Sequence, residues 1–169
     1  MKLPDPFNGE SKPINLFNEK LAERVKQSGW MEAGANIIMI QDSGGTPRNL
    51  ITEYGRLTVE DIEANMQNFI GQQTRQAQNS VQLFQCLTNS MTEAAHLKIV
   101  VESSKYMDDD TPVGELLFKL MMQKAIIDTR ATATHLRENI TNLDTYMSTV
   151  NSNIEKFNQY VNVNVDGLK

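Results

Sequence analysis

The side chains of this sequence that could do chemistry are few and widely separated. The two histidines, His96 and His135, stand far apart, and neither has the His-x-x-x-His spacing that places two metal ligands on one helix face. Cys86 is the single cysteine, and it lies within an apolar pattern of helical spacing. A nucleophile needs a base brought beside it by the fold. We therefore expect ordinary polar positions for both histidines and a buried or half-buried thiol for Cys86.

Two loops carry the remaining groups of chemical interest. The aspartates at 108–110 could hold Mg²⁺, which prefers carboxylate ligands. They precede Thr111 and Pro112, a pair typical of a helix start, so we expect them at a helix N-terminus, where negative charge is favourable. The loop at 44–47 has neither the lysine of a phosphate-binding loop nor the spacing of a dinucleotide motif. The sequence thus predicts no catalytic, cofactor-binding or metal site and no enzyme.

The elements that position these groups are predicted to be helices, because apolar residues recur every three or four positions. An extended arm is expected over 1–11, followed by a helix that Ser11 caps and Gly29 ends. The apolar face of this helix consists of Ile14, Phe17, Leu21 and Val25. A loop is expected at 42–47, and two helical turns at 48–54.

The middle of the chain predicts further helices separated by short breaks. Thr58 and Asp61 resemble a capping box, Gly71 precedes a Gln-rich helix, and Thr92 begins another helix. The expected apolar stripes of these three helices are Val59, Ile62, Met66, Phe69 and Ile70, then Ala77, Val81, Phe84 and Leu87, then Leu97, Val100 and Val101. Apart from the alternation at 161–165, no convincing period-2 segment is present.

The C-terminal part is expected to carry wide apolar faces. One helix should begin at Thr111 and Pro112, and Asn151 should cap the last helix. Between them a series of nearly heptad spacing consists of Leu136, Ile140, Leu143, Met147 and Val150. The prediction for the whole chain is an all-α fold of seven or eight helices, with more than ~60% helix against a general frequency of about 30–35%.

Charge and hydropathy exclude several classes of protein. The chain has 16 basic and 21 acidic side chains, a net charge of −5, and no run of lysines and arginines, so RNA binding should be weak. The longest apolar run, 37–40, is far shorter than the ~18 residues of a membrane span. With no apolar leader after Met1 and one cysteine, a cytoplasmic protein without a membrane partner is expected.

Short motifs also follow one another in a characteristic order over most of the chain. They lie at 29–30, 49–55, 75–80, 86–87, 90–92, 114–119, 127–132, 143–147 and 153–158. In order and spacing they resemble the Gag-like, capsid-forming region of copia-type LTR retrotransposons, of a type common in diatoms and related algae. The resemblance covers roughly residues 7 to 165.

The resemblance implies a structural protein with a capsid-like helical bundle, as one body or two lobes, whose copies self-associate into a shell for the retrotransposon ribonucleoprotein. The charge balance changes near Met107, which suggests an N-terminal lobe at 12–107, a C-terminal lobe at 108–165 and a tail at 166–169. The chain departs from the family pattern because it has no zinc knuckle and no basic tail. RNA would therefore be bound only weakly, or through other parts of a polyprotein.

The last predicted helix is the candidate for self-association. Its apolar residues at i, i+3, i+6 and i+7 are Ile154, Phe157, Tyr160 and Val161. This stripe either packs inside the chain, on Leu136, Ile140, Leu143 and Met147, or meets the same stripe of another copy with Phe157 at the centre. The alternative function is a helical adaptor that binds a protein partner through an apolar groove without assembling.

Overall fold

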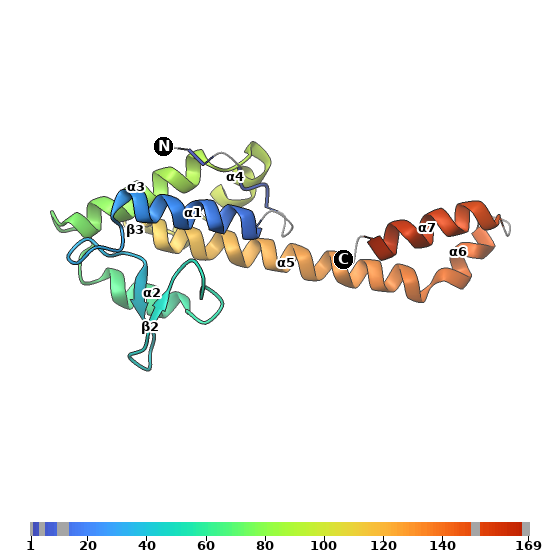
Figure 1. The fold of residues 1–169 in the computed structure, drawn as a ribbon, viewed down its shortest axis with the longest axis horizontal. Coiled ribbons are helices and arrows are strands. Elements are labelled where there is room, and N and C mark those ends of the chain that lie inside the picture. The colour runs from blue at the N-terminus through green and yellow to red at the C-terminus, as the bar shows by residue number, and fades with distance from the viewer. Residues whose placement is uncertain (1, 4–5, 10–13, 150–152, 167–169) are drawn as a thin grey trace. The chain divides into compact units, whose positions relative to one another are not determined.

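The computed structural model describes residues 2–3, 6–9, 14–149 and 153–166 (Figure 1). Its helices are α1 Ile14–Ser28, α2 Val59–Met66, α3 Arg75–Asn89, α4 Glu93–Val100, the 3₁₀ helix η1 Ser103–Lys105, α5 Gly114–Thr141, α6 Leu143–Thr149 and α7 Ile154–Asp166. Its strands are β1 Met39–Gln41, β2 Pro47–Asn49, β3 Met107–Asp108 and β4 Thr111–Pro112. Helices account for 58% of the residues and strands for 8%. The all-α class with seven or eight helices is confirmed for the described residues, at a helix content just below the one expected.

The chain divides into two compact units, Met1–Ala125 and Ile126–Lys169, and α5 begins in the first and ends in the second. The expected boundary between the lobes 12–107 and 108–165 lies inside the first unit, at the hairpin of β3 and β4. The two compact units therefore have a different boundary from that of the expected lobes, and the division into those lobes stays a prediction.

Helix α1 forms as its apolar spacing predicts. Ile14, Phe17, Leu21 and Val25 are all buried. The helix ends before Gly29, whose φ of 69° is easily adopted by glycine, and Trp30 then turns fully into the core. The first part of α5 lies beside α1, where the Asn18 amide donates to the Met122 sulfur at 3.7 Å. Ser11, the expected cap, lies outside the described residues.

The described part of the N-terminal arm is extended and packs on the connection between α3 and α4. The Phe7 amide donates to the Ser90 carbonyl at 2.7 Å, and the Thr92 amide donates to the Phe7 carbonyl at 2.8 Å. Leu3 and Phe7 are both buried, and the Phe7 ring lies 5.5 Å from the ring of Phe17. The arm is thus a layer of the core of the first unit.

The expected helical turns at 48–54 are wrong, because residues 47–49 form β2 and pair with β1 in an antiparallel hairpin. Side-chain oxygens compete here with the helical hydrogen bonds of the backbone. The Asp42 carboxylate accepts the amides of Gly44 and Thr46 at 3.0 and 2.8 Å, which closes the hairpin turn. The Asn49 side chain accepts the amide of Ile51 at 2.9 Å and so shapes the turn that follows.

The expected helix start at Thr111 and Pro112 is also wrong. These residues form β4, which pairs with β3, and the aspartates at 108–110 contribute to the hairpin and its turn, not to a helix N-terminus. The Val113 amide donates to the Tyr106 carbonyl at 2.9 Å, so the hairpin continues to Val113. Helix α5 starts only at Gly114, where the chain reaches α3.

The sequence predicts the start of α2 correctly, but the buried faces of α3 and α4 differ from the predicted ones. The capping box of α2 is confirmed: the Asp61 amide donates to the Thr58 hydroxyl at 3.1 Å, and the Thr58 amide donates to the Asp61 carboxylate at 2.8 Å. The buried residues of α3 are Asn79, Ser80, Leu83, Cys86 and Leu87, so the expected stripe is only half-buried apart from Leu87. The buried residues of α4 are Ala95 and Ile99, and the expected stripe of Leu97, Val100 and Val101 is exposed instead.

The second unit consists of the end of α5 with α6 and α7, and α6 packs against α7. The expected heptad series is interrupted at Asn142, where α5 ends and α6 begins. The alternation at 161–165 lies within helix α7. Val150 and Asn151 lie outside the described residues.

Candidate self-association surfaces

Helix α7 presents the stripe that the sequence singles out for self-association. The Asn153 side chain accepts the Lys156 amide at 3.1 Å, so this asparagine caps the helix start. Ile154 is 68% exposed. Phe157, Tyr160 and Val161 are half-buried. The stripe exists as predicted on one helix, and the second unit covers it only in part.

Helix α6 supplies the contact that covers the far end of this stripe. The ring of Tyr160 stacks on the ring of Tyr146, with centroids 3.7 Å apart and planes inclined by 13°. Ile140, Leu143 and Met147, the expected partners within the chain, are half-buried, and the side chain of Leu136 lies outside the described part. Tyr160 thus packs within the second unit and Ile154 is exposed to solvent, and whether the stripe belongs to the core or to an interface stays a prediction.

A second apolar surface, which the sequence pattern assigned to the core, lies on α4 in the first unit. Leu97 is 61% exposed, Val101 is 79% exposed and Val100 is exposed beside them. The opposite face of α4 packs through Ala95 and Ile99. A Cβ on Gly9 would lie 3.9 Å from the Cβ of Ala95, so the arm approaches α4 closely on the side of this small residue. The small Ala95 was the available signal that this side faces inward.

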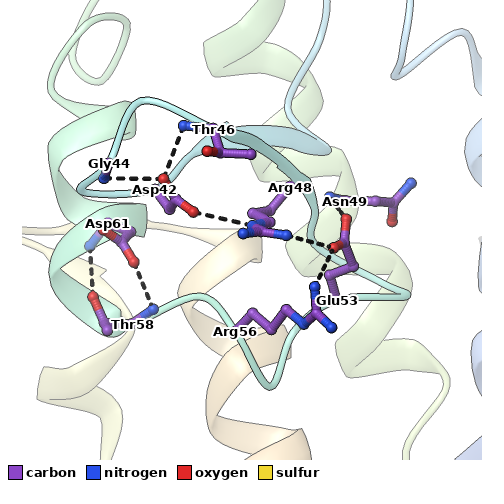
Figure 2. A network of polar contacts seen from close by, with 9 residues as sticks. All are labelled: Asp42, Gly44, Thr46, Arg48, Asn49, Glu53, Arg56, Thr58 and Asp61. Carbon is purple, nitrogen blue, oxygen red and sulfur yellow. Dashed lines mark hydrogen bonds and ion pairs between the residues drawn. The ribbon is translucent and has the colours of Figure 1, made fainter.

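On the β1–β2 hairpin, Arg48 forms ion pairs with two nearby carboxylates of the same chain (Figure 2). The Arg48 guanidinium donates to Asp42 at 3.0 Å and to Glu53 at 3.1 Å, and Arg56 lies 3.8 Å from Glu53. The pKa of Asp42 is lowered, first by the Thr46 amide and then by Arg48. Two carboxylates that stay ionised thus neutralise Arg48, and the network holds the hairpin without leaving a cationic surface for phosphates.

The first unit also buries a carboxyl group between α3 and α5. The Ser80 hydroxyl donates to Glu115 at 2.5 Å, and the Gly114 amide lies 3.3 Å from the same hydroxyl oxygen. Glu115 is 1% exposed, and its other carboxyl oxygen has no partner. Burial raises the pKa of Glu115 to about 7, against the lowering effect of the Ser80 hydrogen bond. The carboxyl group is thus enclosed by the core of the first unit.

The side chains of the cysteine and of the described histidine are buried or half-buried. Cys86 is fully buried, which confirms the predicted buried thiol, and burial raises the pKa of that thiol. His96 is half-buried on α4, and the side chain of His135 lies outside the described part. Among the described residues, no group of three or more histidine, cysteine, aspartate or glutamate side chains could hold a metal ion.

No described helix combines the length and the apolar character that crossing a bilayer requires.

Comparison of the chain with protein-family models, with curated proteins and with solved structures gives no match.

Proposed function

We propose that this chain is a structural, capsid-type protein of the Gag class, which acts in the cytoplasm and whose copies self-associate into a shell for a retrotransposon ribonucleoprotein. The proposal builds on the order of motifs along the sequence. The observation that carries the self-association is the exposed start of the α7 stripe, where Ile154 is 68% exposed while Phe157, Tyr160 and Val161 are half-buried.

An apolar stripe that is only partly covered favours association over solvation. Ile154, Phe157 and Val161 stand at i, i+3 and i+7, so they lie on one face of α7 and extend over two helical turns. A partly exposed aromatic such as Phe157 is the type of side chain that anchors protein interfaces, where one anchor contributes ~2 kcal/mol or more. In this proposal the open end of the stripe meets a neighbouring copy, while Tyr160 holds α7 on α6.

Charge supports a structural role in which RNA is bound elsewhere. The net charge is −5, and Arg48 is neutralised within its own hairpin. Counterion release from phosphates therefore contributes little to RNA binding by this chain. In the proposal, the grip on RNA comes from other parts of a polyprotein, and this chain supplies protein–protein contacts.

The test is the mass of the purified protein as a function of concentration and salt, measured by light scattering and by electron microscopy. Ile154→Glu places a charge at the open end of the stripe and is expected to give a folded monomer where the parent associates. Leu16→Glu is the matched control, because Leu16 is 43% exposed on α1 in the first unit. The control should associate like the parent.

Two outcomes overturn the proposal. One is a parent protein that stays monomeric at all salt and protein concentrations, which would favour the adaptor that binds a different protein through an apolar surface. The other is a parent that associates while Ile154→Glu associates equally well, which would remove α7 from the interface. Circular dichroism of both variants confirms that the helices are retained.

A further inference from the structure

We propose that the contact between α3 and the start of α5 is a pH-sensitive switch, in which loss of the proton from the buried Glu115 carboxyl releases the β3–β4 hairpin and the first turn of α5 from α3. The rest of the first unit stays folded in this open form. The change takes place within one chain and does not depend on the self-association proposed above. Three observations carry it: the packing around Glu115, the charges around it, and the small size of the hairpin.

The first observation is the tight packing where α3 and α5 cross. A Cβ on Gly114 would lie 2.5 Å from the Ser80 carbonyl oxygen and 2.7 Å from the Cβ of Leu83. The next residue, Glu115, is 1% exposed, and its carboxyl accepts a hydrogen bond from the Ser80 hydroxyl at 2.5 Å. The other carboxyl oxygen is buried without a hydrogen-bond partner among the described residues. A negative charge at this place is therefore poorly compensated.

The second observation is that neither of the two crossing helices supplies a cation to Glu115 within the part that the structure describes. On α3, the residues at 76–84 include no ionisable side chain. On α5, Lys119 stands one turn after Glu115, but its ammonium group donates to the Tyr54 carbonyl at 2.6 Å. Burial lowers the pKa of Lys119, and Asp61 is the charged group that raises it. Lys119 is thus engaged elsewhere and does not neutralise Glu115.

The neighbouring elements supply no countercharge either. The hairpin before Glu115 carries the aspartates at 108–110, and Tyr106 is the ionisable group at its base. In α1, which lies beside the first part of α5, the charged side chains are half-buried or exposed and the buried face is apolar. Burial raises the pKa of Glu115 to about 7, against the lowering effects of the Ser80 hydroxyl and its own backbone, and no charged side chain of the described residues acts on it. Glu115 therefore changes its charge near neutral pH.

The third observation is that the part of the fold next to Glu115 is small enough to open alone. The hairpin consists of two residue pairs, and all four residues are half-buried. The Val113 amide closes it by donating to the Tyr106 carbonyl at 2.9 Å. Val113 is fully buried and leaves the core on opening, so the open form stays a minor one while Glu115 keeps its proton. Beyond the first turn, Leu117 and Phe118 are buried and keep α5 in the core.

Hydrogen exchange of single backbone amides, measured by NMR on the full-length protein, tests the switch. The reporters are the amides of Val113 and Leu117, which donate to the carbonyls of Tyr106 and Val113 and lose these acceptors on opening. Each rate is compared with that of an unstructured chain at the same pH, which removes the intrinsic pH dependence of exchange. The open form has the ordinary pKa of 4.5 for Glu115 and the closed form one of about 7, so the protection of both amides should fall by about 70-fold between pH 5 and pH 8.

The dependence of exchange on urea separates a local opening from unfolding of the whole unit. A local opening exposes little surface, so at pH 8 the amides of Val113 and Leu117 should exchange faster than those of Leu21 and Val25 in α1. Their exchange should also be nearly independent of urea at low concentrations. Equal protection of all four amides, with the same urea dependence, would show that the chain opens only by global unfolding and would overturn the proposal.

Two variants and a control test the assignment to Glu115. Glu115→Gln stays neutral, so the protection of Val113 should remain constant from pH 5 to pH 8. Ser80→Ala removes a hydrogen bond that lowers the pKa of Glu115, so the fall in protection should continue to a higher pH than in the parent. Glu93→Gln, at an exposed carboxyl in the first turn of α4, is the matched control and should behave like the parent.

The outcomes for these variants are distinct. A pH dependence like that of the parent in Glu115→Gln overturns the proposal, because another group would then cause the opening. If Glu115→Gln does not fold, Ser80→Ala decides alone. A Ser80→Ala profile that levels off at the same pH as the parent overturns the proposal, since a purely structural role of Ser80 would change the extent of protection and not the pH at which it levels off.

Discussion

At the scale of single residues, Glu115 is a group whose protonation differs between the folded and the unfolded chain. Its carboxyl is fully enclosed, accepts one hydrogen bond from Ser80 and has a pKa of about 7 in the folded state, against 4.5 as the ordinary value. The folded chain therefore retains the proton over a pH range in which the unfolded chain has released it. The contribution of this group to stability is complete below pH 4.5 and is lost as pH rises through about 7.

The first prediction follows from this difference. Between pH 5 and pH 8 the free energy of unfolding should fall, by about 3 kcal/mol as an order of magnitude, because each pKa unit corresponds to ~1.4 kcal/mol. Glu115→Gln keeps a neutral group that can bond to Ser80, so its stability should change much less over the same range. Urea unfolding of both proteins at several pH values measures the difference. An equal loss of stability in Glu115→Gln would assign the pH dependence to other groups.

A second prediction concerns Gly114, where α5 starts against α3. A Cβ at this position would lie 2.5 Å from the Ser80 carbonyl oxygen and 2.6 Å from the Phe84 amide nitrogen, and both are backbone atoms. Gly114→Ala should therefore force the two helices apart and cost about 1–3 kcal/mol of stability. Gly55→Ala is the matched control, because nothing lies within 4 Å of its Cβ position. Thermal unfolding compares the two, and an unchanged melting temperature for Gly114→Ala would contradict the close crossing.

At the scale of elements, α4 shows how tertiary contacts choose the buried side of a short helix. Leu97, Val100 and Val101 are more apolar than Ala95, and the sequence pattern predicted them as the core stripe. The arm lies along the side of Ala95, where a large side chain would separate the arm from the helix. The larger residues are consequently exposed.

This arrangement gives the third prediction. Ile99→Ala should cost about 2–4 kcal/mol, because it removes a buried side chain and leaves a cavity. Leu97→Ala should change the stability of the first unit by no more than ~0.5 kcal/mol, since most of this side chain is in solvent. Chemical unfolding of the two variants at low protein concentration, where copies do not associate, makes the comparison. If Leu97→Ala lost more stability than Ile99→Ala, the buried face of α4 would be the one that the sequence predicted.

At the scale of the whole molecule, the balance of charge bears on the binding of nucleic acids. The 21 acidic side chains exceed the 16 basic ones, and within the described residues the carboxylates of Asp42, Glu53 and Glu102 form ion pairs with Arg48, Arg56, Lys105 and Lys124. Basic side chains used in this way are less available to phosphates.

The fourth prediction is that RNA binding is weak. In a fluorescence titration at physiological salt, single-stranded RNA should bind with a dissociation constant above ~1 µM, and the binding should be lost as salt increases. The same titration with Ile154→Glu tests whether assembly strengthens binding by presenting many copies. Sub-micromolar binding by the monomeric variant would show a basic surface that the charge balance conceals.

The sequence by itself determined the features that depend on neighbours along the chain. The spacing of Ile14, Phe17, Leu21 and Val25 predicted the buried face of α1, and Thr58 with Asp61 predicted the start of α2. The stripe of α7 was also visible, since it depends only on helical spacing. These features could be read because the interacting groups stand three or four residues apart, within one or two helical turns.

Only the tertiary structure decided the features that depend on distant residues. Residues 48–54 contain helix-compatible side chains, but Asp42 and the strand at 39–41 pair with Arg48 and draw this segment into a hairpin. The start of α5 moves to Gly114 because this glycine meets Ser80 and Phe84, about thirty residues earlier in the chain. The exposed face of α4 follows in the same way from the arm at Phe7, more than eighty residues before it. In each case the free energy of a long-range contact outweighed a weak local preference, which a pattern of spacing along the chain does not contain.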